Sequence, residues 1–228
     1  MPSEFPLSPK LLKGAFVVYD SHTPGSKAKV IAFQYNPDQV SRSLSQGRAP
    51  RESASTSRGE AQQDTFRIEG APRETINISV TLNAADQLEE PEKNKSIVEN
   101  GLHPVLATLE MLLYPTSDEV VQSEERAEQG EVQLNPADLP LTVLVWGKAR
   151  VVPVLITNFS VTEEAFDTRL NPIEVKIELG LSVLNDTDLP ADSMGQDIYR
   201  AYQEQKESLA QKYQAGEHEE QITGLLPS

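Results

Sequence analysis

The residues whose side chains could catalyse a reaction or bind a metal are scattered along the chain. Glu163 and Glu164 are adjacent carboxylates, but catalysis by a carboxylate pair needs two groups that converge across a bond. Neighbouring residues of a strand instead point to opposite faces. The run Asn185-Asp-Thr-Asp188 matches only the start of a calcium loop, because the Gly at position six and the Glu at position twelve are missing. We interpret this run as a turn that ends a strand.

Metal and cofactor signals are also weak. His22, His103 and His218 have no spacing that would place two ligands on one face, and the chain has no Cys. Neither a Gly-rich phosphate loop nor a dinucleotide fingerprint occurs, and no Ser lies in a G-x-S-x-G elbow. We therefore expect a protein that is not an enzyme, with no metal and no cofactor.

The charge of the chain bears on its partners. The net charge is −15, which argues against nucleic acid, because phosphate binding depends on clustered Lys and Arg. Residues 1–60 hold eight Lys or Arg against five Asp or Glu, whereas residues 86–131 hold three against twelve. Two interpretations stay open: a solvated acidic loop, or neighbouring copies that pack with the basic end of one against the acidic middle of the next.

No targeting or membrane signal is found in the first residues or in the apolar runs. Lys13 and Gly14 interrupt the apolar stretch 11–18, and no small-residue cleavage site follows it. The strongest apolar runs, 141–146 and 151–156, are far shorter than the roughly 20 residues of a membrane-spanning helix. We expect a soluble cytoplasmic protein that does not insert directly into a membrane.

The elements that must position any site are mostly strands. Residues 14–20 and 29–35 are rich in β-branched and aromatic side chains and predict a hairpin, and residues 40–44 could add a third strand. Strict alternation of apolar and polar residues over 75–82 and 173–183 predicts antiparallel strands with one buried face. A further pair is predicted at 141–146 and 150–161, where Pro153 indicates an edge or a bulge.

Two helices are predicted. The first runs from Pro104 to Pro115 with an apolar stripe, and its flanks, 84–103 and 116–140, are interpreted as long connections. The second extends from about 196 to 214. One face of this helix combines apolar and aromatic side chains: Ile198, Tyr202, Leu209 and Tyr213.

Together these elements predict an α+β fold, in which an antiparallel β-barrel or sandwich carries one inserted helix and a C-terminal helix. The predicted organisation is an N-terminal extension (1–10), a β-rich domain (11–190) and a C-terminal helix and tail (191–228). Within the domain, residues 45–63 have almost nothing to bury and predict a mobile loop.

Two groups of residues are candidate protein interfaces. Arg48, Arg51 and Arg58 belong to the region 33–68, which could reach toward acidic surface on a neighbouring copy. The stripe of the C-terminal helix, Ile198, Tyr202, Leu209 and Tyr213, is the second candidate. Packing of this stripe on the chain's own sheet is an equally open alternative.

Several segments of the chain resemble the tube and inner-baseplate protein family of contractile injection systems, which are phage-tail-like particles. The resemblance covers roughly residues 10–190 and rests on six segments: 12–20, 30–37, 76–88, 109–115, 144–147 and 159–167 through Asn171-Pro172.

The resemblance implies a non-enzymatic baseplate component that forms a ring and joins the inner tube to the spike hub. The implied partners are copies of the chain itself, inner tube proteins, spike hub proteins and other baseplate proteins. Many relatives carry a C-terminal LysM module, but the residues after 190 are too few for one. The alternative is a β-barrel domain that binds or converts a small ligand of unknown structure.

Overall fold

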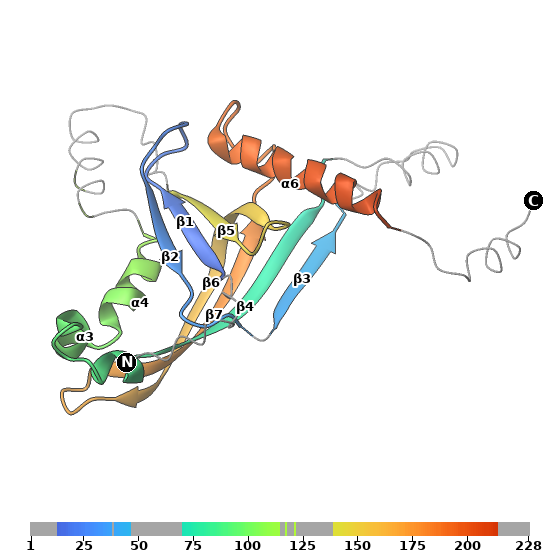
Figure 1. The fold of residues 1–228 in the computed structure, drawn as a ribbon. Coiled ribbons are helices and arrows are strands. Elements are labelled where there is room, and N and C mark those ends of the chain that lie inside the picture. The colour runs from blue at the N-terminus through green and yellow to red at the C-terminus, as the bar shows by residue number, and fades with distance from the viewer. Residues whose placement is uncertain are drawn as a thin grey trace, which may run out of the picture.

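Seven antiparallel strands form a single sheet in the computed structural model, which describes residues 13–37, 39–46, 70–114 and 139–213 together with Ser117 and Val121. The strand order is β2-β1-β5-β6-β7-β4-β3 (Figure 1). The strands are β1 (Ala15–Tyr19), β2 (Ala28–Ala32), β3 (Val40–Ser45), β4 (Arg73–Asn83), β5 (Leu141–Val145), β6 (Val151–Phe166) and β7 (Pro172–Val183). The helices are α2 (Ala85–Leu88), α3 (Lys95–Asn100), α4 (His103–Glu110) and α6 (Met194–Ala210). The predicted α+β class is confirmed.

The two strands with the clearest alternation lie next to each other in the sheet. Along β4, every second side chain from Glu74 to Leu82 is buried, and the intervening side chains are exposed. Strand β7 pairs with β4 so that Ile76 is opposite Leu181 and Val80 is opposite Ile177. The two apolar faces therefore coincide and form the centre of the core.

The sheet is bent into a sandwich-like shape and stays open. The closed barrel, one of the two predicted forms, is not formed, because the edge strands β2 and β3 are not paired with each other. At one end the gap is bridged by Gln34, which follows β2. Its carboxamide donates to the Asn83 carbonyl at 2.6 Å and accepts from the Asn83 N–H at 2.9 Å. Gln34 thus forms hydrogen bonds with both the N–H and the carbonyl of Asn83, at the end of β4, as a residue of a neighbouring strand would.

The helices lie at opposite ends of the bent sheet. Helix α6 crosses one end, and α3 and α4 lie near the other (Figure 1). Pro104 occupies the first turn of α4, and Leu106 and Leu109 enter the core. The prediction of one inserted helix is wrong, because residues 84–103, which lack the long apolar stripe of α4, contain the short helices α2 and α3.

The helical insert is attached to the turn between β6 and β7. The Leu102 N–H donates to the Pro172 carbonyl at 2.8 Å, and the Asn171 side chain donates to the Glu99 carbonyl at 3.1 Å. Gly101 lies at this junction with a positive φ of 56°. An added Cβ would lie 2.5 Å from the Pro172 carbonyl oxygen. Only glycine fits here without displacing the hairpin.

Pro153 does not lie at an edge, and the prediction for this residue is wrong. It belongs to β6, which lies between β5 and β7, and it is opposite Val143. The register shifts of β6 occur later, between Ile156 and Asn158 and after Glu163. The proline is tolerated because it is the third residue of the strand, just past the point where β7 ends at Val183. Its carbonyl still accepts from the Leu184 N–H at 2.9 Å.

We predict that Gly101→Ala lowers the free energy of unfolding more than Gly25→Ala does. Both glycines have positive φ, 56° and 84°, but no atom lies within 4 Å of a Cβ added at Gly25. Gly25→Ala should cost about 1 kcal/mol through backbone conformation alone. Gly101→Ala should cost at least about 1 kcal/mol more because of the steric contact. Urea denaturation followed by circular dichroism measures both, and equal losses would contradict this account of the junction.

Candidate functional site

Helix α6 has a buried half and an exposed half. Ser193 caps its N-terminus by accepting from the Gln196 N–H. Of the predicted stripe, Tyr202 is buried and Ile198 packs partly against the core, whereas Leu209 is 46% exposed and Tyr213 is 79% exposed. Tyr213 lies beyond the last helical residue, Ala210. The predicted stripe therefore divides between the core and the surface, and its role as an interface stays a prediction.

Beneath α6 lies a buried carboxylate that the sequence analysis missed. Glu74 of β4 is only 4% exposed, and its Oε1 accepts from the Tyr202 hydroxyl at 2.9 Å. The Lys206 ammonium donates to Oε2 at 2.9 Å, and the Arg42 guanidinium lies 3.6 Å from Oε1. A buried carboxylate requires such partners. This cluster of Glu74, Tyr202, Lys206 and Arg42 fixes α6 to β3 and β4.

The three candidate arginines, Arg48, Arg51 and Arg58, lie outside the described residues, as does most of the predicted loop 45–63. Of the region 33–68, the described part is residues 33–37 and 39–46. In this described part, Arg42 of β3 lies beside Glu74. Contacts of Arg48, Arg51 and Arg58 with a neighbouring copy stay a prediction.

The tip of the β6–β7 hairpin is internally hydrogen-bonded and presents apolar groups. Asp167 Oδ1 accepts from the backbone N–H groups of Arg169 and Asn171 at 2.7 and 2.8 Å. Within this turn Leu170 has a φ of 66° and is 78% exposed. A left-handed leucine is costly, so the Asp167 hydrogen bonds stabilise a conformation that holds an apolar side chain in solvent.

Among the described residues, Asp167 and Tyr199 have shifted pKa values. Desolvation acts to raise the pKa of Asp167, but hydrogen bonds from the Asn171 side chain and from the backbone of Asn171 and Arg169 outweigh it, so this pKa is lowered. Burial raises the pKa of the Tyr199 hydroxyl, despite a hydrogen bond from Gln203. The Arg169 guanidinium, 3.7 Å from Asp167 Oδ2, also lowers the pKa of this carboxyl. Both shifts therefore have local causes.

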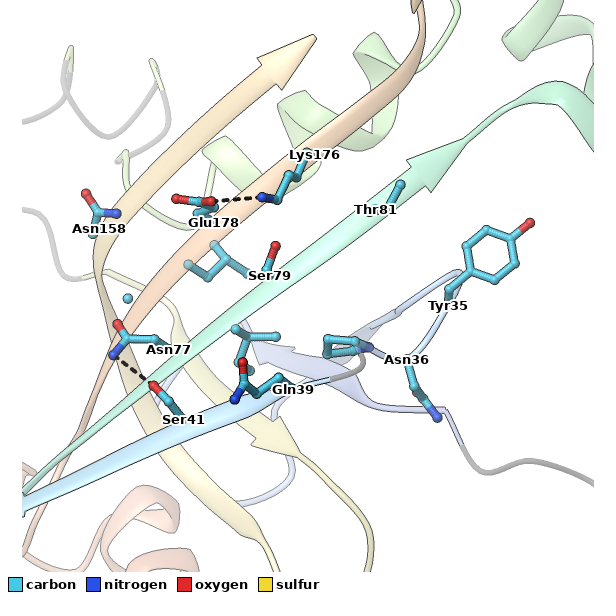
Figure 2. A pocket seen from close by; sticks show the side chains of 14 residues that line it. Tyr35, Asn36, Gln39, Ser41, Asn77, Ser79, Thr81, Asn158, Lys176 and Glu178 are labelled. Atoms are coloured by element: carbon cyan, nitrogen blue, oxygen red, sulfur yellow. Dashed lines mark hydrogen bonds and ion pairs between the residues drawn. The ribbon is translucent and has the colours of Figure 1, made fainter. Parts of the chain in front are cut away.

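A hollow of about 750 Å³ lies on the outer face of the sheet. Its floor is formed by β4, β7 and β6, and its wall by residues 35–37 and Gln39 from the connection between β2 and β3 (Figure 2). Asn77 and Asn158 stand on either side of Gly180, because all three occupy one cross-strand row. The lining includes Tyr35, Gln39, Ser41, Asn77, Ser79, Thr81, Asn158, Lys176, Glu178 and Gly180.

The other predicted features do not form a reactive centre. Glu163 and Glu164 are both exposed on β6, beside a register shift. The run 185–188 is a turn, as predicted, in which the Asp188 N–H donates to the Asn185 carbonyl at 3.0 Å. No group of three His, Asp or Glu among the described residues could hold a metal ion. In the same part of the chain, every helix is too short or too polar to cross a membrane.

Comparison with protein-family models gives no match for this chain, and comparison with curated proteins gives no significant match.

We predict that Glu74→Gln lowers the free energy of unfolding by about 2 kcal/mol at pH 7. The substitution keeps the shape but leaves Lys206 and Arg42 without their buried counter-charge. Glu178→Gln is the matched control, because the Lys176–Glu178 ion pair at 3.2 Å is exposed and should contribute less than about 0.5 kcal/mol. Chemical denaturation of both variants checks this; similar small losses would show that the cluster does not stabilise α6.

Proposed function

We propose that this chain is a non-enzymatic structural component of the baseplate of a contractile injection system, where it forms a ring that joins the inner tube to the spike hub. The proposal rests first on the resemblance of residues 10–190 to the tube and inner-baseplate family. The observation that carries it in three dimensions is the open sheet, whose edge strands β2 and β3 have no further strand partner among the described residues.

Both edges have the properties of an interaction surface. Val30 of β2 is 64% exposed, and Leu44 of β3 is 52% exposed. An unpaired strand edge presents backbone N–H and C=O groups that a second chain can satisfy, and apolar side chains beside it add buried area. Because the two edges differ, a contact between β2 of one copy and β3 of the next is heterologous. Such contacts form a ring when the rotation between successive copies closes, and the proposal requires that it does.

Further exposed apolar groups lie away from the edges. Leu209 and Tyr213 extend past the Glu74 cluster, and Leu170 occupies the rigid hairpin tip. These positions suit contacts with tube, hub or other baseplate proteins, because aromatic and aliphatic anchors dominate the energy of interfaces. The proposed particle assembles in the cytoplasm from copies of this chain and these partners.

The alternative, a ligand-binding or catalytic barrel, depends on an accessible barrel interior. The inner face of the sheet is instead filled by buried apolar side chains from all the central strands and from α4. This packing supports the structural role over a site inside the sheet.

The experiment that tests the proposal is co-sedimentation. The full chain is tagged at its C-terminus in its native host, large particles are sedimented from lysate, and the proteins in the pellet are identified by mass spectrometry. Tube, sheath and spike proteins should accompany the tagged chain. Recovery of the chain entirely in the supernatant, while particles form and sediment, would overturn the proposal.

We predict that Val30→Lys or Leu44→Lys reduces incorporation into sedimented particles at least tenfold. A charged side chain at an edge disfavours strand pairing and burial against a neighbour. Thr162→Lys is the matched control, because Thr162 is exposed on β6 and lies away from both edges. Circular dichroism verifies that all three variants fold. Equal incorporation of the edge variants and the control would exclude the edges as the ring contact.

A further inference from the structure

The described residues that line the hollow on the outer face carry no net charge, although the chain as a whole carries −15. Its floor and wall are lined mainly by carboxamide and hydroxyl side chains. Among the described lining residues, the charged groups are Lys176 and Glu178, whose ammonium and carboxylate lie 3.2 Å apart and neutralise each other. These described side chains together offer no net attraction to a phosphate, a carboxylate or a cation, so their chemistry favours an uncharged ligand.

The polar groups of the hollow have unused hydrogen-bonding capacity. Asn77 Nδ2 donates to the Ser41 hydroxyl over a long 3.5 Å (Figure 2). Among the described residues, no hydrogen bond occupies the side chains of Asn158, Ser79 or Thr81. Carboxamides and hydroxyls each both donate and accept. The complementary ligand therefore carries groups that also do both, as alcohol hydroxyls do.

The hollow is pre-formed. Its floor is held by the β4–β7 and β6–β7 ladders. Its wall is anchored at the Gln34–Asn83 double hydrogen bond and by the Gly14 N–H, which donates to Asn36 Oδ1 at 2.9 Å. Gly180 leaves a notch between the two asparagines, since an added Cβ would lie 3.0 Å from Asn158 Cβ. Rigid donors and acceptors lower the entropic cost of binding.

The position of the hollow favours a small polyhydroxylated ligand over a peptide that binds as an added strand. The backbone groups of β4 and β7 beneath it are already paired with each other, so a peptide cannot bind there by adding a strand. Recognition must come from side chains. At the end opposite Asn158, the half-exposed ring of Tyr35 offers an apolar surface (Figure 2), on which the C–H face of a sugar ring can pack.

We propose that this hollow is a binding site for an uncharged, polyhydroxylated ligand of the size of a short oligosaccharide. Asn77 and Asn158 hydrogen-bond its hydroxyls across the Gly180 notch, Ser79 and Thr81 supply further hydroxyl contacts, and Tyr35 packs against a ring. The volume of about 750 Å³ lies within the range of small-molecule sites. The inference is independent of the baseplate role.

The test is isothermal titration of the full chain with three neutral trisaccharides, maltotriose, cellotriose and xylotriose, and with the anionic trimer of galacturonic acid. At least one neutral trisaccharide should bind with a Kd of a few millimolar or tighter, and the anionic trimer should bind at least tenfold more weakly. The double variant Asn77→Ala/Asn158→Ala should weaken the neutral sugar about tenfold or more, the effect of two or more lost hydrogen bonds.

Thr75→Ala is the matched control, because Thr75 lies on the same exposed face of β4 but outside the hollow; its Kd should stay within twofold of the unaltered chain. Circular dichroism verifies that the variants fold. The proposal is overturned if no neutral trisaccharide binds, if the anionic trimer binds as well, or if the double variant binds as tightly as the unaltered chain. Preferential binding of an uncharged Gly/Ser pentapeptide would equally overturn it.

Discussion

The connection from β2 to β3 must cross the whole sheet, because these consecutive strands occupy its opposite edges. Seven flat strands spaced about 4.8 Å apart would be about 29 Å wide. Phe33 is still held beside β1, because its N–H donates to the Gly14 carbonyl at 2.8 Å. The seven steps from Phe33 to Val40 reach at most about 25 Å when fully extended. The sheet therefore has to bend until its edges approach, and this bend encloses the core. The Gln34–Asn83 hydrogen bonds hold the approach, and the same connection becomes the wall of the outer hollow.

Bending also determines where polar groups can be buried. Glu74 has the inward orientation of its strand, but it lies near the start of β4, where α6 crosses the end of the sheet. A carboxylate at that level meets Tyr202 and Lys206 instead of a purely apolar layer. The helix is consequently attached through a polar cluster and the buried residues Tyr199 and Tyr202, which leaves the segment after Lys206 without support from the sheet. The place where α6 crosses the end of the sheet thus explains both why its first half is attached and why its last turn is exposed.

The sequence predicts best where a single period dominates. The alternation in β4 and β7 is visible because each strand has one wet face, and the stripes of α4 and α6 follow the helical repeat. Glu74 shares the parity of Ile76, so parity could have indicated its burial, but its partners come from β3 and α6 and depend on tertiary contacts. The hollow depends on cross-strand register, which places Asn77, Gly180 and Asn158 in one row. The prediction for Pro153 was wrong because proline is tolerated in a central strand where the neighbouring strand has ended. The ends of neighbouring strands are defined only in the folded sheet.

The pairing of β1 with β5 has a consequence for how the chain folds. Ala15 is opposite Val145, so the N-terminal hairpin waits for a partner strand about 130 residues later in the chain. At synthesis rates of about 5–20 residues per second, that interval lasts roughly 6 to 26 seconds. During it, the edge of β1 that later pairs with β5 has unpaired backbone N–H and C=O groups. Such long-range pairing slows folding, and until it forms, the unpaired edge of β1 is a template on which another chain can add a strand.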